Sequence, residues 1–402
     1  MTGMVSSIKH IYRILLVALM VVASNGTTTA NTRVSLLTVG PGREMYQLEG
    51  HSALRIQTDN GDDIAVNWGV FDFHSPNFAY RFIKGETDYS IGATNFTWFL
   101  AEYAHAGRYV TEQELMLTEA EAAEVVRLMT LNMQPENREY RYNYLLDNCA
   151  TRPLAIVEKA LAVDGAKLQI AMEVEPASIR EDMRRYHANY PSYQLFIDFA
   201  LGSGIDREAS LRERAFAPLF LSEMVDHTKI VMADGTTRRL AGATTTLLHS
   251  NLGETSEEGI PAWLIIAVVT LSAIAVTVLD VRRRRVTQWY DAVYYTLIGL
   301  LGLISAFLIF ISEHEATSPN INILWADPVC LIIPLLIWFK KCKRLVFYLQ
   351  IINFALILVW LIEQPLFHQS INLLFIPLVL SDMLRSASYI YLNRRCHDRI
   401  KA

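Results

Sequence analysis

The last third of the chain is a series of apolar segments, and this feature most strongly limits the possible folds. Five segments, most of them near the ~20 residues that a helix needs to cross a bilayer, follow one another with short breaks: 260–279, 289–312, 325–339, 345–363 and 371–391. Hydrophobic residues make up 52% of the 402 positions, and the mean hydropathy is +0.22. The sequence therefore predicts an all-α bundle of five transmembrane helices over residues 256–402.

Basic residues between these segments predict how the bundle is oriented. Lys and Arg gather in the first and third connecting loops and in the C-terminal tail: 282–285, 340–344 and 394–401. The second and fourth loops contain neither residue. Because basic loops stay on the cytoplasmic side, the C-terminus is expected in the cytoplasm and everything before residue 256 outside it.

The N-terminus predicts export as well. Lys9 and Arg13 precede an apolar run over 14–23 and then small and polar residues, which is the order of a secretory signal peptide. We expect the signal to cover residues 1–30, with cleavage after Ala23 or Ala30. An uncleaved anchor is the alternative, although the apolar run is short for one.

Residues 31–255 alternate polar and apolar positions as a globular α+β domain does. Short strand-like runs come first, and Asn60-Gly61 between two of them predicts a β-hairpin. Thr118 and Glu121 form a capping-box pattern that predicts a helix from there to about Met133.

Composition and motifs exclude several classes of function. A net charge of −5 and a pI near 6.1 do not indicate a nucleic-acid-binding protein. The histidines of the exported domain lack metal-ligand spacing, no phosphate-binding glycine loop occurs, and no serine lies in a strained strand-to-helix Gly-Ser-Gly elbow. We expect no metal, no cofactor and no serine hydrolase.

Cys149 is the only cysteine of the expected exported domain, so it has no partner there for a disulfide. It precedes a segment with Pro153 in the first turn and apolar residues at helical spacing. A helix N-terminus favours a thiolate, and we expect the pKa of Cys149 to be lowered for nucleophilic attack. The alternative is a buried cysteine that only packs.

A cysteine nucleophile needs a base, and His51 at the start of the hairpin is the candidate. A two-residue turn at Asn60-Gly61 makes paired residue numbers sum to 121, which places Asp72 diagonally beside His51 as its orienting group. A slip of one residue would place Asn67 or Phe71 there instead.

The second loop between spans, "EHEATSPNINILWADP", carries polar residues close to the bilayer. Polar groups that enter a span need partners, so Asn320 and Asn322 are candidates for substrate binding, with a capped loop end as the alternative.

Several motifs together resemble one known family. The residues "GHSALRI", "WGVFDF", "FIKGETDY" and above all "YNYLLDNCATRP" resemble the exported domain of the Lnb-type lipoprotein N-acyltransferases of Gram-negative bacteria, and "NINILWADP" resembles that family's polar stretch between spans. More remotely, the domain resembles the permuted papain-like fold of NlpC-related hydrolases and lecithin:retinol acyltransferase, in which His precedes Cys.

This resemblance implies a function. A phospholipid would donate an acyl chain to the α-amino group of a diacylglyceryl lipoprotein through a Cys149 thioester, with His51 moving protons and helix-start N–H groups holding the oxyanion. Asn148 and Arg152, which flank Cys149 in the most specific motif, would contact substrate. The protein would be a multi-pass inner-membrane protein with a periplasmic N-terminal domain.

Two alternatives remain open from the sequence. One is a membrane-anchored thiol amidase or peptidase that acts on the cell wall, although a single anchor would suffice for that task. The other is a non-catalytic scaffold in which Cys149 is a packing residue.

Overall fold

The computed structural model describes residues 32–72, 75–253 and 255–398, and the expected signal peptide lies outside them. The chain forms two compact units. The first contains residues up to Pro176 and Ala209–Thr255, and the second contains Ala177–Glu208 and everything from Ser256 on. The segment Ala177–Glu208, which the sequence places in the exported domain, therefore packs with the C-terminal helices.

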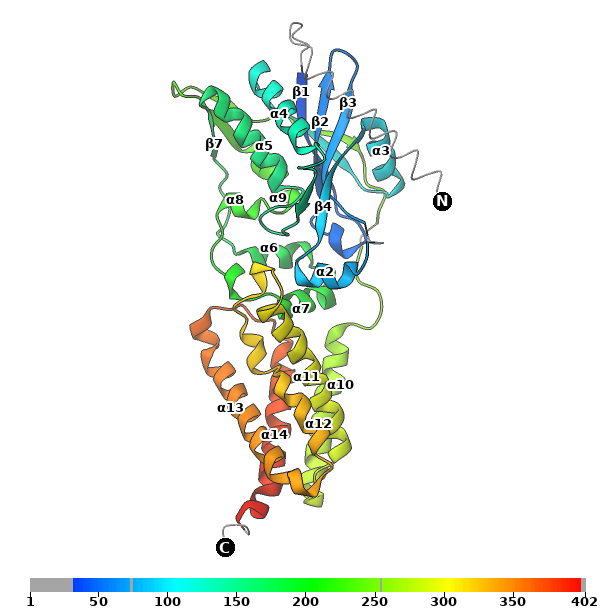
Figure 1. Cartoon of the computed structure of the whole chain (residues 1–402), viewed down its shortest axis with the longest axis vertical. Helices are drawn as coiled ribbons and strands as arrows, with labels where there is room; N and C mark the ends of the chain where they lie inside the picture. Colours follow the sequence, from blue (N-terminus) through cyan, green and yellow to red (C-terminus); the bar gives the residue numbers. More distant parts are fainter. Residues whose placement is uncertain (1–31, 73–74, 254, 399–402) are drawn as a thin grey trace. The chain divides into compact units, whose positions relative to one another are not determined.

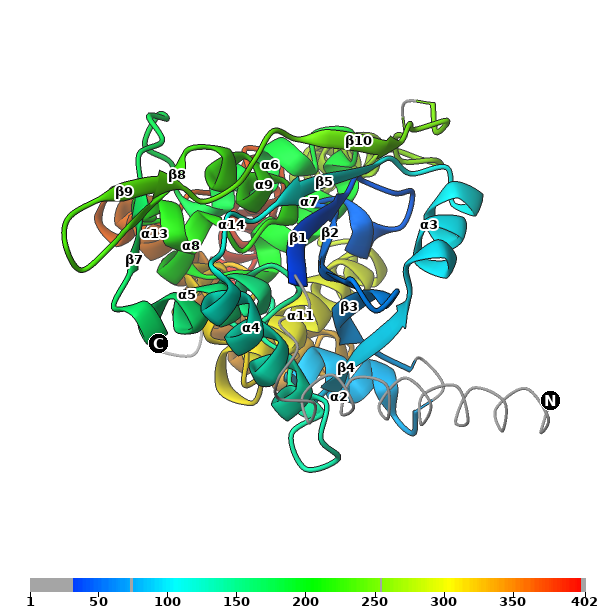
Figure 2. The same ribbon diagram turned by 90° about the horizontal axis from the view of Figure 1, so that it is seen from above.

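A seven-stranded antiparallel sheet is the centre of the first unit (Figures 1 and 2). Its strand order is β10-β5-β1-β2-β3-β4-β6. The strands are β1 (Thr32–Val39), β2 (His51–Thr58), β3 (Asp63–Val70), β4 (Asp88–Asn95), β5 (Val110–Glu114), β6 (Glu139–Arg141) and β10 (Thr245–Leu248). Neighbouring strands mostly follow one another in the chain, as short hairpin connections favour.

Both faces of this sheet are covered, so its strands carry apolar residues on both sides. Helix α3 (Phe96–His105) covers one face (Figure 2) and contributes to a core made of Leu37, Val39, Ala53, Ala65, Phe96, Phe99 and Val110. The alternate residues of β1 and β2 point to the other face, because successive side chains of a strand point in opposite directions.

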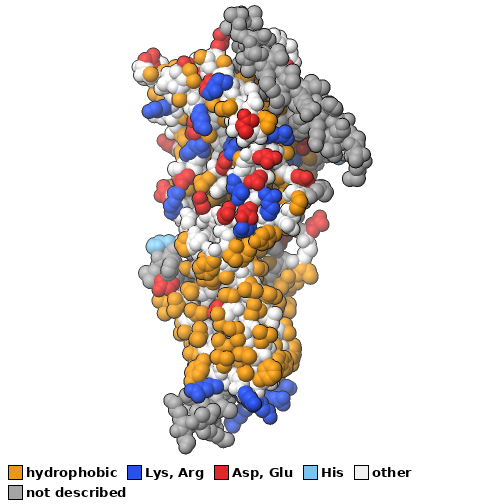
Figure 3. Space-filling model, viewed as in Figure 1, with side chains coloured by type: hydrophobic (Ala, Val, Ile, Leu, Met, Phe, Trp, Pro, Cys, Tyr) orange, Lys and Arg blue, Asp and Glu red, His pale blue; other side chains and the backbone are white. Residues whose placement is uncertain are grey.

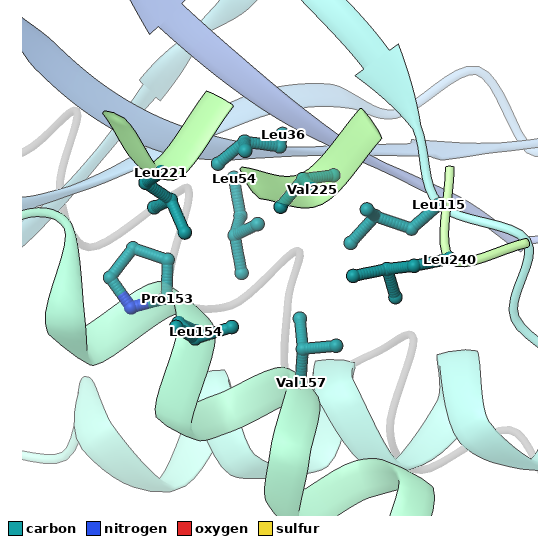
Figure 4. A pocket seen from close by; sticks show the side chains of 9 residues that line it. All are labelled: Leu36, Leu54, Leu115, Pro153, Leu154, Val157, Leu221, Val225 and Leu240. Carbon is teal, nitrogen blue, oxygen red and sulfur yellow. The ribbon is translucent and has the colours of Figure 1, made fainter. Parts of the chain in front are cut away.

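On that other face lie α4 (Glu119–Asn132), α5 (Thr151–Leu161) and α9 (Pro218–Asp226). The predicted capping box of α4 is confirmed, because Thr118 accepts a hydrogen bond from the Glu121 amide while the Glu121 carboxylate accepts one from the Thr118 amide. Figure 4 shows the apolar contact of α5 and α9 with the sheet. The space left between these side chains is about 10 Å³, the lower limit for one water molecule.

The predicted hairpin forms, but its register differs from the prediction by one residue. β2 and β3 pair with Ala53 opposite Asn67 and Gln57 opposite Asp63, so paired numbers sum to 120 rather than 121. The reason is the loop, which is longer than the assumed two-residue turn and closes with the Gly61 amide on the Thr58 carbonyl. A one-residue change moves a side chain to the opposite face.

Smaller elements complete the first unit. They are η1 (Met45–Gln47), α2 (Phe78–Lys84), η2 (Ala162–Asp164), α8 (Leu211–Arg214) and a three-stranded sheet of β7 (Lys167–Ile170), β8 (Thr228–Val231) and β9 (Thr237–Arg239). The permuted papain-like topology expected from the sequence stays a prediction.

The second unit is helical. Its elements are α6 (Ile179–Tyr186), α7 (Pro191–Ala200), η3 (Ser203–Ile205), α10 (Ala262–Arg283), α11 (Gln288–Phe310), η4 (Glu315–Thr317), η5 (Ile321–Leu324), η6 (Pro328–Leu331), α12 (Ile332–Leu336), η7 (Lys340–Cys342), α13 (Lys343–Phe367) and α14 (Phe375–Asp398). Among the described residues, three helices are long and apolar enough to cross a membrane: α10, α11 and α13 with the η7 turn before it.

The predicted count of five spans is not reproduced by this criterion. The third predicted segment is not one continuous helix but the short turns η6 and α12. The fifth is α14, which has 24 residues and contains the buried charged residues Asp382 and Arg385. Figure 3 shows hydrophobic side chains over the outer surface of these C-terminal helices and Lys and Arg gathered at one end. This distribution is typical of a membrane-spanning bundle.

Candidate functional site

Cys149 lies just before α5, beside the first residues of β2 and the last residues of β3. The Ser52 hydroxyl donates a hydrogen bond of 2.7 Å to the Cys149 carbonyl oxygen. A Cβ added to Gly69 in β3 would lie 3.9 Å from the Cβ of Cys149. The backbone amides of Ser52 and of Cys149 itself lower the pKa of the thiol. The cysteine is therefore fixed against two strands, with its side chain partly exposed.

Asn148 holds the start of α5. Its buried side chain accepts hydrogen bonds from the amides of Ala150 and Thr151, at 2.8 and 2.9 Å, and donates to the carbonyl oxygens of Tyr144 and Phe216. All four bonds are made within the protein, so the geometry favours a capping role for Asn148. The amides of Ala150 and Thr151 are therefore already bonded, and the expectation that an amide at the helix start holds the oxyanion stays a prediction for the Cys149 amide.

His51 is oriented by Asn67, not by Asp72. Its Nε2 lies 3.0 Å from Oδ1 of Asn67. An amide oxygen only accepts, so Nε2 carries the proton and Nδ1 is the basic nitrogen. Asp72 lies beyond the end of β3 and is exposed. The hairpin register explains the difference: Ala53 pairs with Asn67, so Asn67 takes the diagonal position beside His51 that the assumed turn gave to Trp68, and Asp72 is no longer a diagonal neighbour.

The expected low pKa of Cys149 is wrong for this structure. Burial raises the pKa of Cys149 to about 11, and this outweighs the two amides at the sulfur, which lower it. Burial likewise lowers the pKa of His51 to about 4. Both groups are therefore neutral at physiological pH, as a thiol and an imidazole that can accept its proton.

Arg108 is a charged residue of this site that sequence reasoning missed. Its side chain is 4% exposed, its Nε donates to the Gly40 carbonyl oxygen at 2.7 Å, and its Nη2 is buried without a hydrogen-bond partner among the described residues. The guanidinium lies over the Tyr103 ring, which is 6.4 Å from the His51 ring. Its positive charge lowers the pKa values of both Cys149 and His51. No motif around "HAGRY" pointed to this role.

Arg152 makes contacts within the protein. Its Nη2 donates to the Asp147 carboxylate at 2.7 Å, and its guanidinium lies 3.3 Å from the centre of the Tyr140 ring. Its side chain keeps 20% exposure. The predicted contact of Arg152 with substrate stays a prediction.

Asn320 and Asn322 belong to the second unit and bind backbone there. Both donate to the carbonyl oxygen of Phe199 at the end of α7, at 2.8 and 3.3 Å. Asn320 also accepts from the Gln369 side chain, and Asn322 accepts from the Trp325 indole. Both are buried, so their geometry favours holding the loop to α7, and their predicted role in substrate binding stays a prediction.

The segment Ala177–Glu208 contains a buried network of ion pairs. Arg180 donates to the carboxylates of Asp198 and Asp206 at 3.2 and 2.6 Å. Asp198 also pairs with Arg184 at 3.1 Å and accepts from Asn372 at 3.0 Å. The Arg180 and Arg184 pairs hold Ala177–Glu208 together, and the bond of Asn372 to Asp198 links this segment to the C-terminal part of the chain. Among the described residues there is no group of three His, Cys, Asp or Glu that would hold a metal ion.

Comparison with known proteins gives two matches to family models. Residues 23–185 match the Lnb N-terminal periplasmic domain, and residues 255–396 match the Lnb transmembrane domain. No curated protein and no solved structure matches the chain. With both domains present in the order that the sequence motifs indicate, the chain belongs to the Lnb family, as a membrane protein of lipoprotein biogenesis with a periplasmic N-terminal domain and a membrane-spanning C-terminal region.

Proposed function

We propose that this protein is a lipoprotein N-acyltransferase that moves an acyl chain from a phospholipid to the α-amino group of a diacylglyceryl-cysteine through a thioester on Cys149. The observation that carries the proposal is the His51–Asn67 pair at the strand ends that hold Cys149. A Cys, a His and an orienting Asn form the set that papain-like enzymes use. This set supports the expected relationship to them.

In the first step, Nδ1 of His51 takes the proton of the Cys149 thiol while the sulfur attacks the ester carbonyl of the phospholipid. A C–S bond forms, the C–O bond to glycerol breaks, and the leaving oxygen takes the proton from His51. A lysophospholipid departs and the acyl thioester remains.

In the second step, the amine of the lipoprotein attacks the thioester carbonyl. A C–N bond forms, the C–S bond breaks, and His51 transfers the ammonium proton to the leaving sulfur. The amides of Ser52 and Cys149, which lower the pKa of the thiol, are the candidate donors for the oxyanion of both steps. The charge of Arg108 favours the thiolate as it forms.

The proposed location follows the distribution of basic residues. We place the protein in the inner membrane with its C-terminus in the cytoplasm, because the Lys and Arg clusters gather at one end of the C-terminal helices (Figure 3).

The test is to supply phospholipid without an amine acceptor and to look for an acyl adduct on Cys149 by mass spectrometry. We expect a hydroxylamine-sensitive thioester in the wild type and none in Cys149→Ala. Adding a diacylglyceryl lipopeptide should discharge it and give a fatty amide at the N-terminus. An adduct-free Cys149 with active N-acylation would refute the thioester route, and cell-wall cleavage without N-acylation would indicate an amidase.

A further inference from the structure

Helix α2 of the first unit is apolar but is not part of the core. It contains Phe78, Tyr80, Phe82 and Ile83, and none of its seven residues is buried. Tyr80 is 54% exposed, and Phe82 and Ile83 are each 48% exposed. A helix this short gains most of its stability from packing of an apolar face, so apolar side chains that are about half exposed require an explanation.

A second exposed apolar element lies beside this helix. Met45 and Tyr46 of η1 are 54% and 55% exposed. The Tyr46 ring lies 5.8 Å from the Phe71 ring, which in turn lies 5.9 Å from the Phe78 ring of α2. The two elements therefore form one surface, here named the α2–η1 patch: Met45, Tyr46, Phe78, Tyr80, Phe82 and Ile83.

A continuous row of aromatic rings connects this patch with the cysteine. Phe71 lies 5.2 Å from Tyr89, and Tyr89 stacks on Tyr142 at 4.2 Å. The edge of the Tyr142 ring lies 3.4 Å from the position that a Cβ on Gly69 would occupy, and Cys149 is the next neighbour of that position. The missing side chain of Gly69 thus leaves the last ring and the thiol next to each other.

We propose that the α2–η1 patch contacts the membrane surface and that the row of rings receives one acyl chain of the donor phospholipid, with its ester at Cys149. This inference rests on the proposed acyl transfer and names the surface through which its donor enters. Tyr89 in the middle of the row is 6% exposed, so the acyl chain has to displace the side chains that cover it, and the rings then offer the apolar surface that a hydrocarbon chain prefers.

Three observations favour a phospholipid membrane as the partner of the α2–η1 patch. The chain crosses between the two units three times, so three covalent connections tether the first unit to the unit that contains the membrane-spanning helices. The last turn of α2 adds Arg81 and Lys84, which pair with Asp88 and Glu86, to the aromatic residues, and aromatic residues mixed with polar and charged ones are typical of a membrane interface. The apolar space between the sheet and α5 (Figure 4) is too small for an acyl chain, at about 10 Å³.

The experiment uses the full chain with Cys149→Ala, so that binding is measured without turnover. The protein is placed in vesicles of phosphatidylethanolamine and phosphatidylglycerol that contain a phospholipid with a diazirine at the end of one acyl chain. After irradiation we expect labelled peptides from α2, η1 and the segment with Phe71 that follows β3. Changing Phe82 and Ile83 together to Ser should reduce this labelling roughly tenfold.

The matched control is Val163→Ser on η2, another apolar side chain that is 56% exposed, which should leave the labelling unchanged. Equal loss in both variants, or labelling confined to the C-terminal helices, would overturn the proposal. So would labelling that appears only when the diazirine is carried by a diacylglyceryl lipopeptide, because the patch would then bind the acceptor.

Thioester formation and labelling of the patch test the proposed function and the lipid-contact inference separately. If wild-type protein forms no thioester but the patch is still labelled, the lipid-contact inference stands and the acyl-transfer mechanism falls. If the thioester forms but the patch is not labelled, the inference falls and the mechanism stands. Because the substituted side chains are about half exposed, the melting temperatures of both variants should match the parent, and an alternative pair, Tyr80→Ser with Met45→Ser, repeats the test if one does not.

Discussion

The Nε2 of His51 lies 3.0 Å from Oδ1 of Asn67, and this bond determines which nitrogen of the imidazole faces away to act as the base. The two residues come from neighbouring strands whose first and last residues hold Cys149. The candidate site is therefore built on the rigid part of the sheet and not on a loop.

Replacing Asn67 should reduce acyl transfer much more than replacing Asp72. Asn67→Ala removes the acceptor that fixes the tautomer and orientation of His51, so we expect kcat to fall by roughly 10²-fold, toward the loss of about 10²–10⁴-fold expected for His51→Ala. Asp72→Ala should stay near wild type. The measurement is lipopeptide N-acylation at saturating phospholipid, and a larger loss for Asp72→Ala than for Asn67→Ala would restore Asp72 as the orienting group.

Alkylation of Cys149 should depend on pH as that of a neutral thiol. With the pKa of Cys149 raised to about 11, the thiolate fraction, and with it the rate of reaction with iodoacetamide, should rise roughly tenfold for each unit between about pH 7 and 9. A variant with Cys330→Ser, Cys342→Ser and Cys396→Ser isolates this thiol. A rate that is already constant below pH 7 would indicate a resting thiolate paired with a protonated His51.

Removing the charge of Arg108 should weaken the nucleophile. Because this charge lowers the pKa of Cys149, although less than burial raises it, Arg108→Met should raise that pKa and slow alkylation at pH 8 by a few-fold. Arg108→Lys keeps the charge and should restore most of the rate. Unfolding temperature is measured in parallel, since the Nε bond to the Gly40 carbonyl is also lost in the Met variant. Equal rates in Met and Lys variants of equal stability would remove Arg108 from the mechanism.

Gly69 should be needed for both stability and activity. Its φ is +83°, which side chains avoid, so Gly69→Ala should lower the free energy of unfolding by about 1–3 kcal/mol. The new Cβ would also press toward Tyr142 and Cys149, so activity should fall beyond the loss of folded protein. Gly61→Ala is the control, because its φ is +94° with no atom within 4 Å. It should lose stability and keep its specific activity, and a similar loss of activity in both would exclude the local effect.

Asp198 should stabilise the second unit. It is fully buried between Arg180, Arg184 and Asn372, so Asp198→Ala leaves buried charge without this partner and should cost about 3–5 kcal/mol of unfolding free energy. Arg185→Ala removes a 58% exposed partner of Asp182 and should have little effect. Loss of helical signal on titration with sodium dodecyl sulfate measures both. Equal midpoints would show that the network does not hold α6 and α7 to the C-terminal helices.

Local patterns determined much of this protein from the sequence alone. Spacing and capping residues are short-range properties, so the helix after Thr118, the helix after Cys149 and the β-hairpin follow from neighbouring residues. Long apolar runs likewise required membrane-spanning helices. The thiol and the imidazole were found because Cys149 has no disulfide partner and His51 opens a strand.

Only the tertiary structure decided the rest, because it depends on contacts between residues far apart in the chain. The hairpin loop is one residue longer than the assumed turn, and this places Asn67 rather than Asp72 beside His51. Burial, which no local pattern reports, raised the pKa of Cys149 where a helix start alone would lower it. Asn148 accepts hydrogen bonds from the amides at the start of α5. Arg108 reaches the site from the residues just before β5. The segment Ala177–Glu208 belongs to the same unit as the C-terminal helices and contains buried charges. Each of these depends on which groups lose water together, and that is fixed only when the whole chain has folded.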